Sequence, residues 1–250
     1  MPYLYALAAR ANATGEPLWR PLWWEAPGAG LGGRAGSEAA RKRAVAFAKE
    51  GKATAAAASS VSAPDALAPV RSSFSRLAAE QDSAFVGPAL VVLPVLTEGA
   101  ESVRVPPLGA LDGGRGLDRW YDWRTGAELT ERVAAAAKAE AAEASLPVTR
   151  DRIPVLLRGG HVVPTLDRPR RSTAAQRGDP LTLVVALDGS HRARGELYAD
   201  DGETFDAVSR GSYLWRKVQV FPEGGGGDDA AFSRLITRHT TPTARSSIAS

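Results

Sequence analysis

IPVLLRGGHVVP, residues 153–164, indicates the fold class of this chain more clearly than any other stretch. An apolar run is followed by the pair Gly159-Gly160 and by a second apolar run, the pattern of a strand, a tight turn and a second strand. We therefore expect two β-strands here, over residues 153–157 and 161–164.

The residues before this stretch also carry strand signals from Phe85 onward. The run Ala89–Leu93 is apolar throughout and ends at Pro94, as expected of a strand buried on both faces. Between the strands, residues 131–144 predict a helix with Thr130 as its N-cap. Further strands are predicted at Ser102–Val105, which alternates, and at Trp120–Trp123, which is followed by a turn at Thr125-Gly126.

A second group of strand signals begins near Asp179. Leu181–Leu187 is a strong strand candidate, and Gly195–Tyr198 leads into Asp200-Asp201-Gly202, which we interpret as a hairpin turn. Strand character returns at 213–215 and 217–220, and the residues after Thr237 have the polar composition of a frayed end. Many short strands separated by Gly and Pro favour a mainly β fold built from β-sandwiches.

The beginning of the chain has a different character. Tyr3–Ala13 has helix-compatible spacing that places Leu4, Leu7 and Ala8 on one side, and Gly15 is a plausible stop signal. Leu18–Trp24 is too bulky and apolar for a solvent-exposed loop, so we expect a buried connection or a short strand there.

We interpret residues 27–80 as a mostly disordered, low-complexity insertion. They begin with a Gly-rich linker at 28–33 and end with an Ala/Ser/Pro-rich tract at 53–70, with a short polar helix predicted at 37–50. No Gly-Lys-Ser/Thr follows the Gly run, so the run does not match a phosphate-binding loop.

Composition excludes several functional classes. The 250 residues are 44% hydrophobic and 24% charged, which is ordinary for a soluble globular protein of one or two domains. With no Cys, the chain has no disulfide, zinc-thiolate site or Cys nucleophile. The net charge is +3, and the basic runs 41–43 and 168–171 stand apart, so we expect no nucleic-acid partner.

We also expect no membrane association, because no apolar stretch approaches the roughly 20 residues of a membrane-spanning helix. The first residues, MPYLYAL, lack the basic start and apolar core of a signal peptide.

The residues that could carry chemistry do not form a recognisable site. Adjacent carboxylates such as Asp200 and Asp201 splay apart in a strand or turn, so they make a poor acid and nucleophile pair. Asp228-Asp229 lies in a Gly-rich segment and is a weaker candidate still. His161, His191 and His239 are widely spaced, and none has a second ligand at metal-binding spacing. There is no Gly-x-Ser-x-Gly nucleophile motif. We therefore predict no catalytic, cofactor-binding or metal-binding residue in this chain, and no cofactor.

Aromatic residues leave one binding role open. The chain has six Trp residues, and such side chains either pack in a core or stack on sugar rings; core packing is the more common use. They are Trp19, Trp23, Trp24, Trp120, Trp123 and Trp215.

Five segments, in this order, resemble glycoside hydrolase family 31. Residues 2–7 with 15–23 resemble the helix that closes the family's catalytic (β/α)8 barrel and the exit from it. Residues 87–95, then 120–122 and 153–164, resemble its proximal β-sandwich strands, and residues 170–183 with 195–205 resemble the glucosidase II branch in particular. The chain departs from the family by the long 27–80 segment, by Pro88 where Asp is common, and by the helix at 131–144.

This resemblance implies a domain order and a parent activity. Residues 1–26 would be a short remnant of the catalytic barrel, 27–80 the insertion, 81–165 a proximal β-sandwich and 166–250 the start of a distal β domain. The parent would be a retaining α-glucosidase of the endoplasmic reticulum lumen that trims glucose from N-glycans. It would bind its carbohydrate substrate through the missing barrel and have a possible noncatalytic β subunit as partner. Family 31 catalytic aspartates lie upstream of residue 1, so the isolated chain is expected to be inactive.

A different class of function stays open beside this one. The chain would then be a freestanding, non-catalytic β-sandwich module that binds a carbohydrate or a protein partner. An independent module has no use for a severed barrel helix, so the packing of residues 1–24 discriminates between the two.

Overall fold

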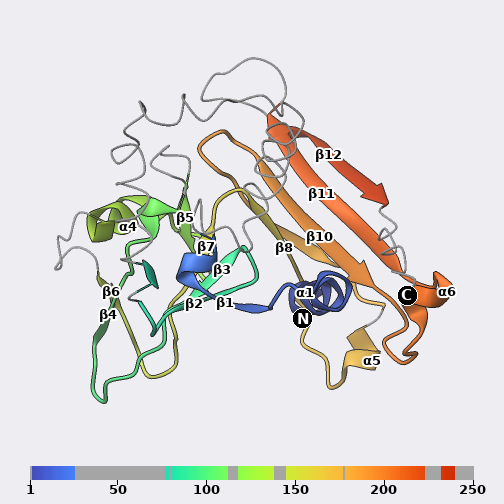
Figure 1. Cartoon of the computed structure of the whole chain (residues 1–250), viewed down its shortest axis with the longest axis horizontal. Helices are drawn as coiled ribbons and strands as arrows, with labels where there is room; N and C mark the ends of the chain where they lie inside the picture. The colour runs from blue at the N-terminus through green and yellow to red at the C-terminus, as the bar shows by residue number, and fades with distance from the viewer. Residues whose placement is uncertain are drawn as a thin grey trace, which may run out of the picture. The chain divides into compact units, whose positions relative to one another are not determined.

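The computed structural model describes residues 2–25, 77–78, 80–111, 118–137, 145–176, 178–222 and 232–239. Strands in mostly antiparallel sheets dominate these residues and helices are few, which confirms the mainly β fold class (Figure 1). The chain divides into two compact units. We call Met1–Leu18 with Arg158–Ser250 the terminal unit, and Trp19–Leu157 the middle unit. Almost all of the predicted insertion, the helix at 37–50 and Asp228-Asp229 lie outside the described residues.

The middle unit is built on a five-stranded sheet with the order β1-β2-β3-β7-β5. Its strands are β1 (Trp19–Pro21), β2 (Ala84–Val86), β3 (Leu90–Val92), β7 (Val155–Arg158) and β5 (Trp120–Asp122). A smaller antiparallel pair joins β4 (Ser102–Arg104) to β6 (Ser145–Pro147). Three helical segments accompany them: η1 (Leu22–Glu25), η3 (Leu108–Ala110) and α4 (Thr130–Ala137).

Apolar runs in the sequence supply the core of this unit. Phe85, Val91 and Leu156 come from three neighbouring strands and are fully buried, and the Trp120 ring lies 6.4 Å from the Phe85 ring. Burying side chains of this size stabilises the fold by about 1.5–3 kcal/mol each relative to exposure. The same cluster includes Leu22, Leu77, Leu93, Val105, Leu108, Leu111, Val133, Ala136 and Leu146.

The terminal unit is built on a second five-stranded sheet with the order β12-β11-β10-β8-β9. The strands are β12 (Phe232–His239), β11 (Leu214–Pro222), β10 (Ala193–Ala199), β8 (His161–Thr165) and β9 (Thr182–Ala186). β8 and β10 run parallel, and the other pairs are antiparallel. Helix α1 (Pro2–Thr14) packs on β10 and β8, and the short helices α5 (Thr173–Gln176) and α6 (Ala207–Arg210) lie in connections (Figure 1).

The interpretation of residues 153–164 as strand, turn and strand is confirmed, with β7 and β8 on either side of a turn at Gly159-Gly160. β7 pairs with β3 in one sheet, whereas β8 pairs with β9 and β10 in the other. Gly160, at a φ of 81°, donates its N–H to Ala186 and accepts from the N–H of Arg194. These bonds direct the chain into the second sheet. One division between the two compact units falls at Leu157/Arg158 in the sequence.

The hairpin expected around Asp200-Asp201-Gly202 forms, since β10 and β11 pair antiparallel, but its connection is not the two-residue turn that Asp-Gly indicates. β10 ends at Ala199, which pairs with Leu214, so the connection includes α6 and is much longer than a two-residue turn. Asp201 Oδ1 accepts hydrogen bonds from the N–H groups of Glu203 and Thr204, and this local turn leads toward α6 rather than back into a strand.

Two helix predictions need correction in detail. α1 ends as expected at Gly15, which has a φ of 76° and bonds to Ala11, but its buried face is Tyr3, Ala6 and Leu7. Leu4 and Ala8, predicted on the same side as Leu7, are exposed.

Thr130 is not the N-cap of α4 but its first residue, and its hydroxyl binds Trp120 N and Glu128. Residues 138–144 of the predicted helix lie outside the described range. None of the helices in the described ranges is long and apolar enough to cross a membrane.

Candidate functional site

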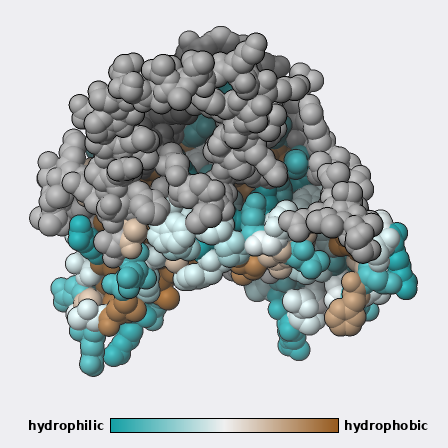
Figure 2. All heavy atoms as spheres, in the orientation of Figure 1, coloured by the Kyte–Doolittle hydropathy of each residue, from teal (hydrophilic) through white to brown (hydrophobic). Residues whose placement is uncertain are grey.

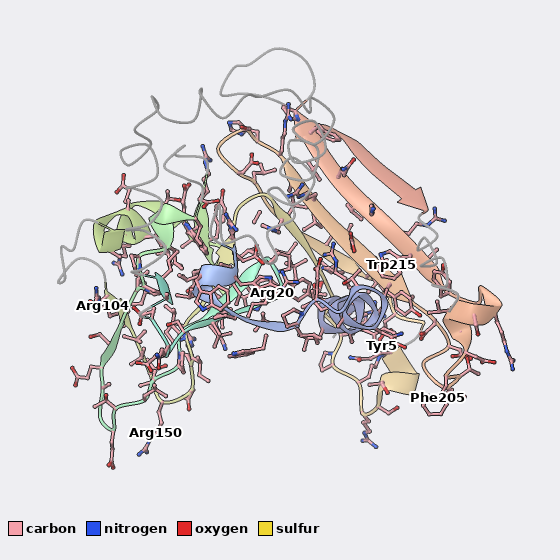
Figure 3. The ribbon with its side chains drawn as sticks, viewed as in Figure 1. Tyr5, Arg20, Arg104, Arg150, Phe205 and Trp215 are labelled. Atoms are coloured by element: carbon pink, nitrogen blue, oxygen red, sulfur yellow. The ribbon has the colours of Figure 1, made fainter. Side chains whose placement is uncertain are left out.

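The most developed polar cluster of the described residues lies where α1 crosses β10 in the terminal unit. Alternate residues of a strand share a face, so Glu196, Tyr198 and Asp200 project toward the helix together. Tyr5 of α1 donates its hydroxyl to Asp200 Oδ1, and Tyr198 donates to Asp200 Oδ2 at 2.9 Å. Figure 3 places Tyr5 on α1 and Trp215 on the adjoining strand β11 in the same region. We call this contact the α1–β10 seam.

Glu196, four residues before Asp200 on the same side of the strand, is a second carboxylate that accepts hydrogen bonds from both the helix and the sheet. Glu196 accepts from Arg10 Nη2 through Oε1 and from Trp215 Nε1 through Oε2, both at 3.3 Å. Arg10 Nε also lies 3.4 Å from Glu16, and the Arg10 side chain is largely buried. Each carboxylate therefore joins the helix to the sheet, and charged hydrogen bonds of this kind are stronger than neutral ones.

Aromatic rings fill the space between the two carboxylates. The Tyr198 ring lies 5.5 Å from Tyr5, 5.8 Å from Tyr213 and 5.4 Å from Trp215. The contacts with Tyr5 and Trp215 are edge-to-face, a geometry that aromatic pairs prefer. Burial, followed by the hydrogen bond to Asp200, raises the pKa of Tyr198 above its ordinary value. The phenol is therefore neutral and serves as a donor, which suits a structural bond better than proton transfer.

The candidate carboxylate pair does not point at a common centre. Asp200 accepts from two phenols and from the N–H of Gly202 at 2.8 Å. Asp201 instead accepts from backbone N–H groups of its own loop and from the Thr204 hydroxyl at 2.8 Å. Each carboxylate is already engaged in holding backbone or rings, so the arrangement offers neither a free nucleophile nor an acid facing it.

The three His residues lie in separate settings. Nδ1 of His161, at the start of β8, lies 3.0 Å from the carbonyl oxygen of Gly159, so this nitrogen carries the proton. Burial lowers the pKa of His161 to about 3, and the nearby Arg158 and Arg194 charges lower it further. His191 sits in a turn at a φ of 55°, and His239 ends β12. Within the described residues, no group of His, Asp or Glu side chains has the geometry of a metal site.

Most of the described Trp side chains contribute to packing, and one is largely exposed. Trp120 and Trp215 are buried, whereas the Trp19 side chain on the edge strand β1 is 59% exposed. On the face seen in Figure 2, the described surface shows only small brown areas among teal ones. Exposed apolar residues on that face are therefore scattered rather than gathered into a broad patch.

The ion pairs differ sharply in burial. Arg20 and Glu25 in the middle unit are both largely buried and lie 2.6 Å apart. Arg170, from the basic run 168–171, makes two hydrogen bonds to Asp179 near the surface. This contact raises the pKa of Arg170 and lowers that of Asp179. The run is thus partly neutralised within the chain; the other basic run, 41–43, lies outside the described residues.

Sequence reasoning missed the α1–β10 seam. Tyr5 and Asp200 are 195 positions apart, so their bond could not be anticipated from local pattern. The available signal was the alternation of Glu196, Tyr198 and Asp200, which places three polar or aromatic groups on one face of a strand.

The chain is similar in sequence to a glycosyl hydrolase family model and to several glucosidases. Residues 68–163 match the model of the glycosyl hydrolase family 31 C-terminal domain. The chain is 34% identical over 227 residues to a probable glucan 1,3-alpha-glucosidase of Arabidopsis thaliana, which covers 90% of this chain and 18% of the relative. It is 39% identical over 128 residues to intestinal sucrase-isomaltase of Oryctolagus cuniculus, covering 51% of this chain and 6% of the relative.

A solved structure supports the same fold. The crystal structure of a glucosidase II alpha subunit in a DNJ-bound form matches with a TM-score of 0.55 and 25% identity, covering 92% of this chain and 19% of that one. The chain thus spans less than a fifth of the length of the relatives that match most of it.

Proposed function

We propose that this chain, whose residues 68–163 match the model of the glycosyl hydrolase family 31 C-terminal domain, is the C-terminal fragment of a retaining α-glucosidase. The parent enzyme hydrolyses terminal α-linked glucose. One observation carries this proposal: the 34% identity to a glucan 1,3-alpha-glucosidase extends over 90% of this chain but only 18% of the relative. A match of that kind is expected of a terminal portion of a larger enzyme.

The proposal places the reacting groups outside this chain. A retaining glycosidase needs two carboxyl groups about 5–5.5 Å apart on either side of the glycosidic bond, one as nucleophile and one as acid. The carboxylates of Asp188, Asp200 and Asp201 accept hydrogen bonds from nearby backbone N–H groups. Because these carboxylates stabilise local backbone, they support a structural role for the β units, with the catalytic residues in an upstream barrel.

A finer version of the proposal concerns the compartment and the partner. The resemblance of residues 170–183 and 195–205 to the glucosidase II branch supports glucose trimming of N-glycans in the endoplasmic reticulum lumen. It also supports a noncatalytic second subunit as partner of the parent. Co-purification of a second polypeptide with the native protein, followed by its identification, tests this version separately from the activity.

The test of activity compares two proteins on one substrate. The purified 250-residue chain and the longest native polypeptide that contains it are each incubated with an aryl α-glucoside. We expect release of the aryl alcohol by the long polypeptide only. Turnover by the 250-residue chain above a preparation from an empty vector would overturn the assignment of catalysis to upstream residues.

An immunoblot decides whether a longer polypeptide exists. An antibody against residues 179–205 is applied to extract of the source cells. A band far above 26.3 kDa is expected. A band only near that mass would contradict the fragment proposal and favour the freestanding module.

The exposed aromatic side chains favour that module as the second candidate. Trp19 is 59% exposed and Phe205 fully exposed, and such rings can stack on sugars. Titration with gluco-oligosaccharides, followed by Trp emission, would show saturable quenching in the wild type and none in Trp19→Ala. If Trp emission shows no saturable change, the hypothesis that this chain binds carbohydrate is contradicted.

A further inference from the structure

Helix α1 carries the only Asn of the chain, and that residue begins the tripeptide Asn12-Ala13-Thr14. Asn followed by any residue except Pro and then by Ser or Thr is the acceptor pattern for N-linked glycosylation. The pattern is short, so its place in the folded structure decides whether a sugar could be carried there.

The helix presents Asn12 on the side opposite its packed face. α1 advances by about 100° per residue, so Asn12 lies about 180° around the axis from Tyr3. Tyr3, Ala6 and Leu7 are buried, and Arg10 reaches Glu196 on the same side. Asn12, Ala13 and Thr14 are all exposed.

The surroundings of Asn12 leave its amide free while holding the backbone in place. Among the described residues, no hydrogen bond or ion pair occupies the Asn12 side chain. The backbone beside it is fixed, because the Thr14 hydroxyl donates to the Arg10 carbonyl at 2.8 Å and Gly15 N–H donates to Ala11 at 2.8 Å. A large substituent on Nδ2 would therefore extend into solvent without displacing the helix.

The same side of α1 also exposes apolar side chains. Ala8 lies one helical turn before Asn12 and Leu4 one turn before that, and residues four apart are neighbours on a helix surface. Leu4 is 39% exposed. A sugar attached at Asn12 has an apolar strip beside it on which its ring faces can rest.

We propose that Asn12 is an N-glycosylation site. This inference rests on the lumenal part of the proposed function, because oligosaccharide transfer takes place in the lumen. In the transfer, Asn12 Nδ2 forms a bond to the anomeric carbon of a lipid diphosphate-linked oligosaccharide. The bond from that carbon to the diphosphate oxygen breaks, the lipid diphosphate leaves, and the amide loses one proton to the transferase.

The experiment follows the whole chain in a eukaryotic host. The 250-residue chain is expressed behind a cleavable secretory signal, and its intact mass is measured before and after treatment with an amidase that removes N-glycans. Cleavage of the signal, read from the same spectrum, shows that the chain entered the lumen. We expect wild type to carry one oligosaccharide, and the released protein to contain Asp at position 12.

Single substitutions separate the acceptor from the fold. Asn12→Gln and Thr14→Ala each remove the oligosaccharide, whereas Thr14→Ser retains it because the hydroxyl remains. Asp188→Asn completes a second acceptor tripeptide with Gly189 and Ser190 in a turn, and this variant gains one further oligosaccharide as a positive control. Circular dichroism of each secreted variant shows that the fold is unchanged.

The outcomes distinguish this inference from the proposed function. Wild type with a cleaved signal and no oligosaccharide, beside a modified Asp188→Asn variant, overturns the assignment of Asn12 and leaves the α-glucosidase proposal untouched. Failure of the parent to hydrolyse an aryl α-glucoside overturns that proposal and leaves the mass result at Asn12 unaffected. Peptide mapping of the native protein tests the same site in the natural chain, where a bare Asn12 overturns it.

Discussion

Among the described glycines of the terminal unit, Gly195 of β10 is the one where an added Cβ would lie closest to a neighbouring strand. A Cβ added at Gly195 would lie 2.2 Å from the carbonyl oxygen of Val162 and 2.8 Å from the Val162 Cβ. Both atoms belong to β8, which runs parallel to β10 beside it. The atoms are backbone or attached directly to it, so no side-chain rotation can relieve the clash. Gly195→Ala must therefore push β8 and β10 apart.

The structure gives the size of that movement and its cost. Ordinary van der Waals contact begins at 3.4 Å, so the gap of 2.2 Å has to open by 1.2 Å. The Arg194 N–H to Gly160 carbonyl bond, now 3.0 Å, lies next to the clash and would stretch beyond bonding distance. Loss of one hydrogen bond contributes about 1 kcal/mol, and over-packing adds about 1–3 kcal/mol. We expect Gly195→Ala to lower the free energy of unfolding by about 3 kcal/mol.

Urea unfolding followed by far-UV circular dichroism and by Trp emission measures this change. For a chain of this length, a loss of about 3 kcal/mol also lowers the Tm by about 6–12 °C. Gly178→Ala is the matched control, because a Cβ there would meet no atom within 4 Å and its φ is not positive. We expect that control to lie within about 0.5 kcal/mol of wild type. If Gly195→Ala is as stable as Gly178→Ala, the argument from close strand packing is refuted.

Three further substitutions test buried groups. Arg20→Met removes one charged partner of the largely buried Glu25 in the middle unit and should lower the free energy of unfolding in urea by up to about 3–5 kcal/mol; adding Glu25→Gln should restore part of that loss, and no recovery would contradict the pairing. His161 has a folded pKa of about 3, below the unfolded 6.5, so its contribution to stability is complete above pH 6.5 and falls as the pH drops toward 3. His161→Gln should lessen the stability lost between pH 7 and pH 4; an unchanged loss would speak against a buried neutral imidazole. The Tyr198 pKa is raised above 10, so its contribution is complete below pH 10 and declines as the pH rises further. Absorbance at alkaline pH should show one late-ionising phenol that Tyr198→Phe removes, and an unaltered titration curve would count against the Asp200 contact.

Local strand formation was predictable because it depends on short apolar runs. Residues 90–92 and 182–186 are strands for the reasons that their sequence indicates: consecutive or alternating apolar side chains with Gly or Pro at the ends. The end of α1 at Gly15 was predictable for a similar reason, since only a residue that tolerates positive φ continues the chain there.

Strand pairing was not predictable, because it depends on contacts far apart in sequence. Gly159-Gly160 is the tight turn that the sequence indicates, but the local pattern does not show that the hydrogen bonds of Gly160 go to Ala186 and Arg194. Asp200-Asp201-Gly202 likewise had the composition of a tight turn, and the Asp201 carboxylate stabilises a different one. The same residue types satisfy several turn geometries, and tertiary contacts select among them.

The seam between α1 and β10 ties the first residues of this chain to the sheet of the terminal unit. Tyr5 and Arg10 supply donors to Asp200 and Glu196, and without them each carboxylate would lose one hydrogen bond beside Tyr198 and Trp215. A buried acceptor that loses its donor destabilises a fold by about 1–3 kcal/mol. The terminal unit is therefore built from residues near both ends of the sequence, with residues 19–157 forming the other compact unit.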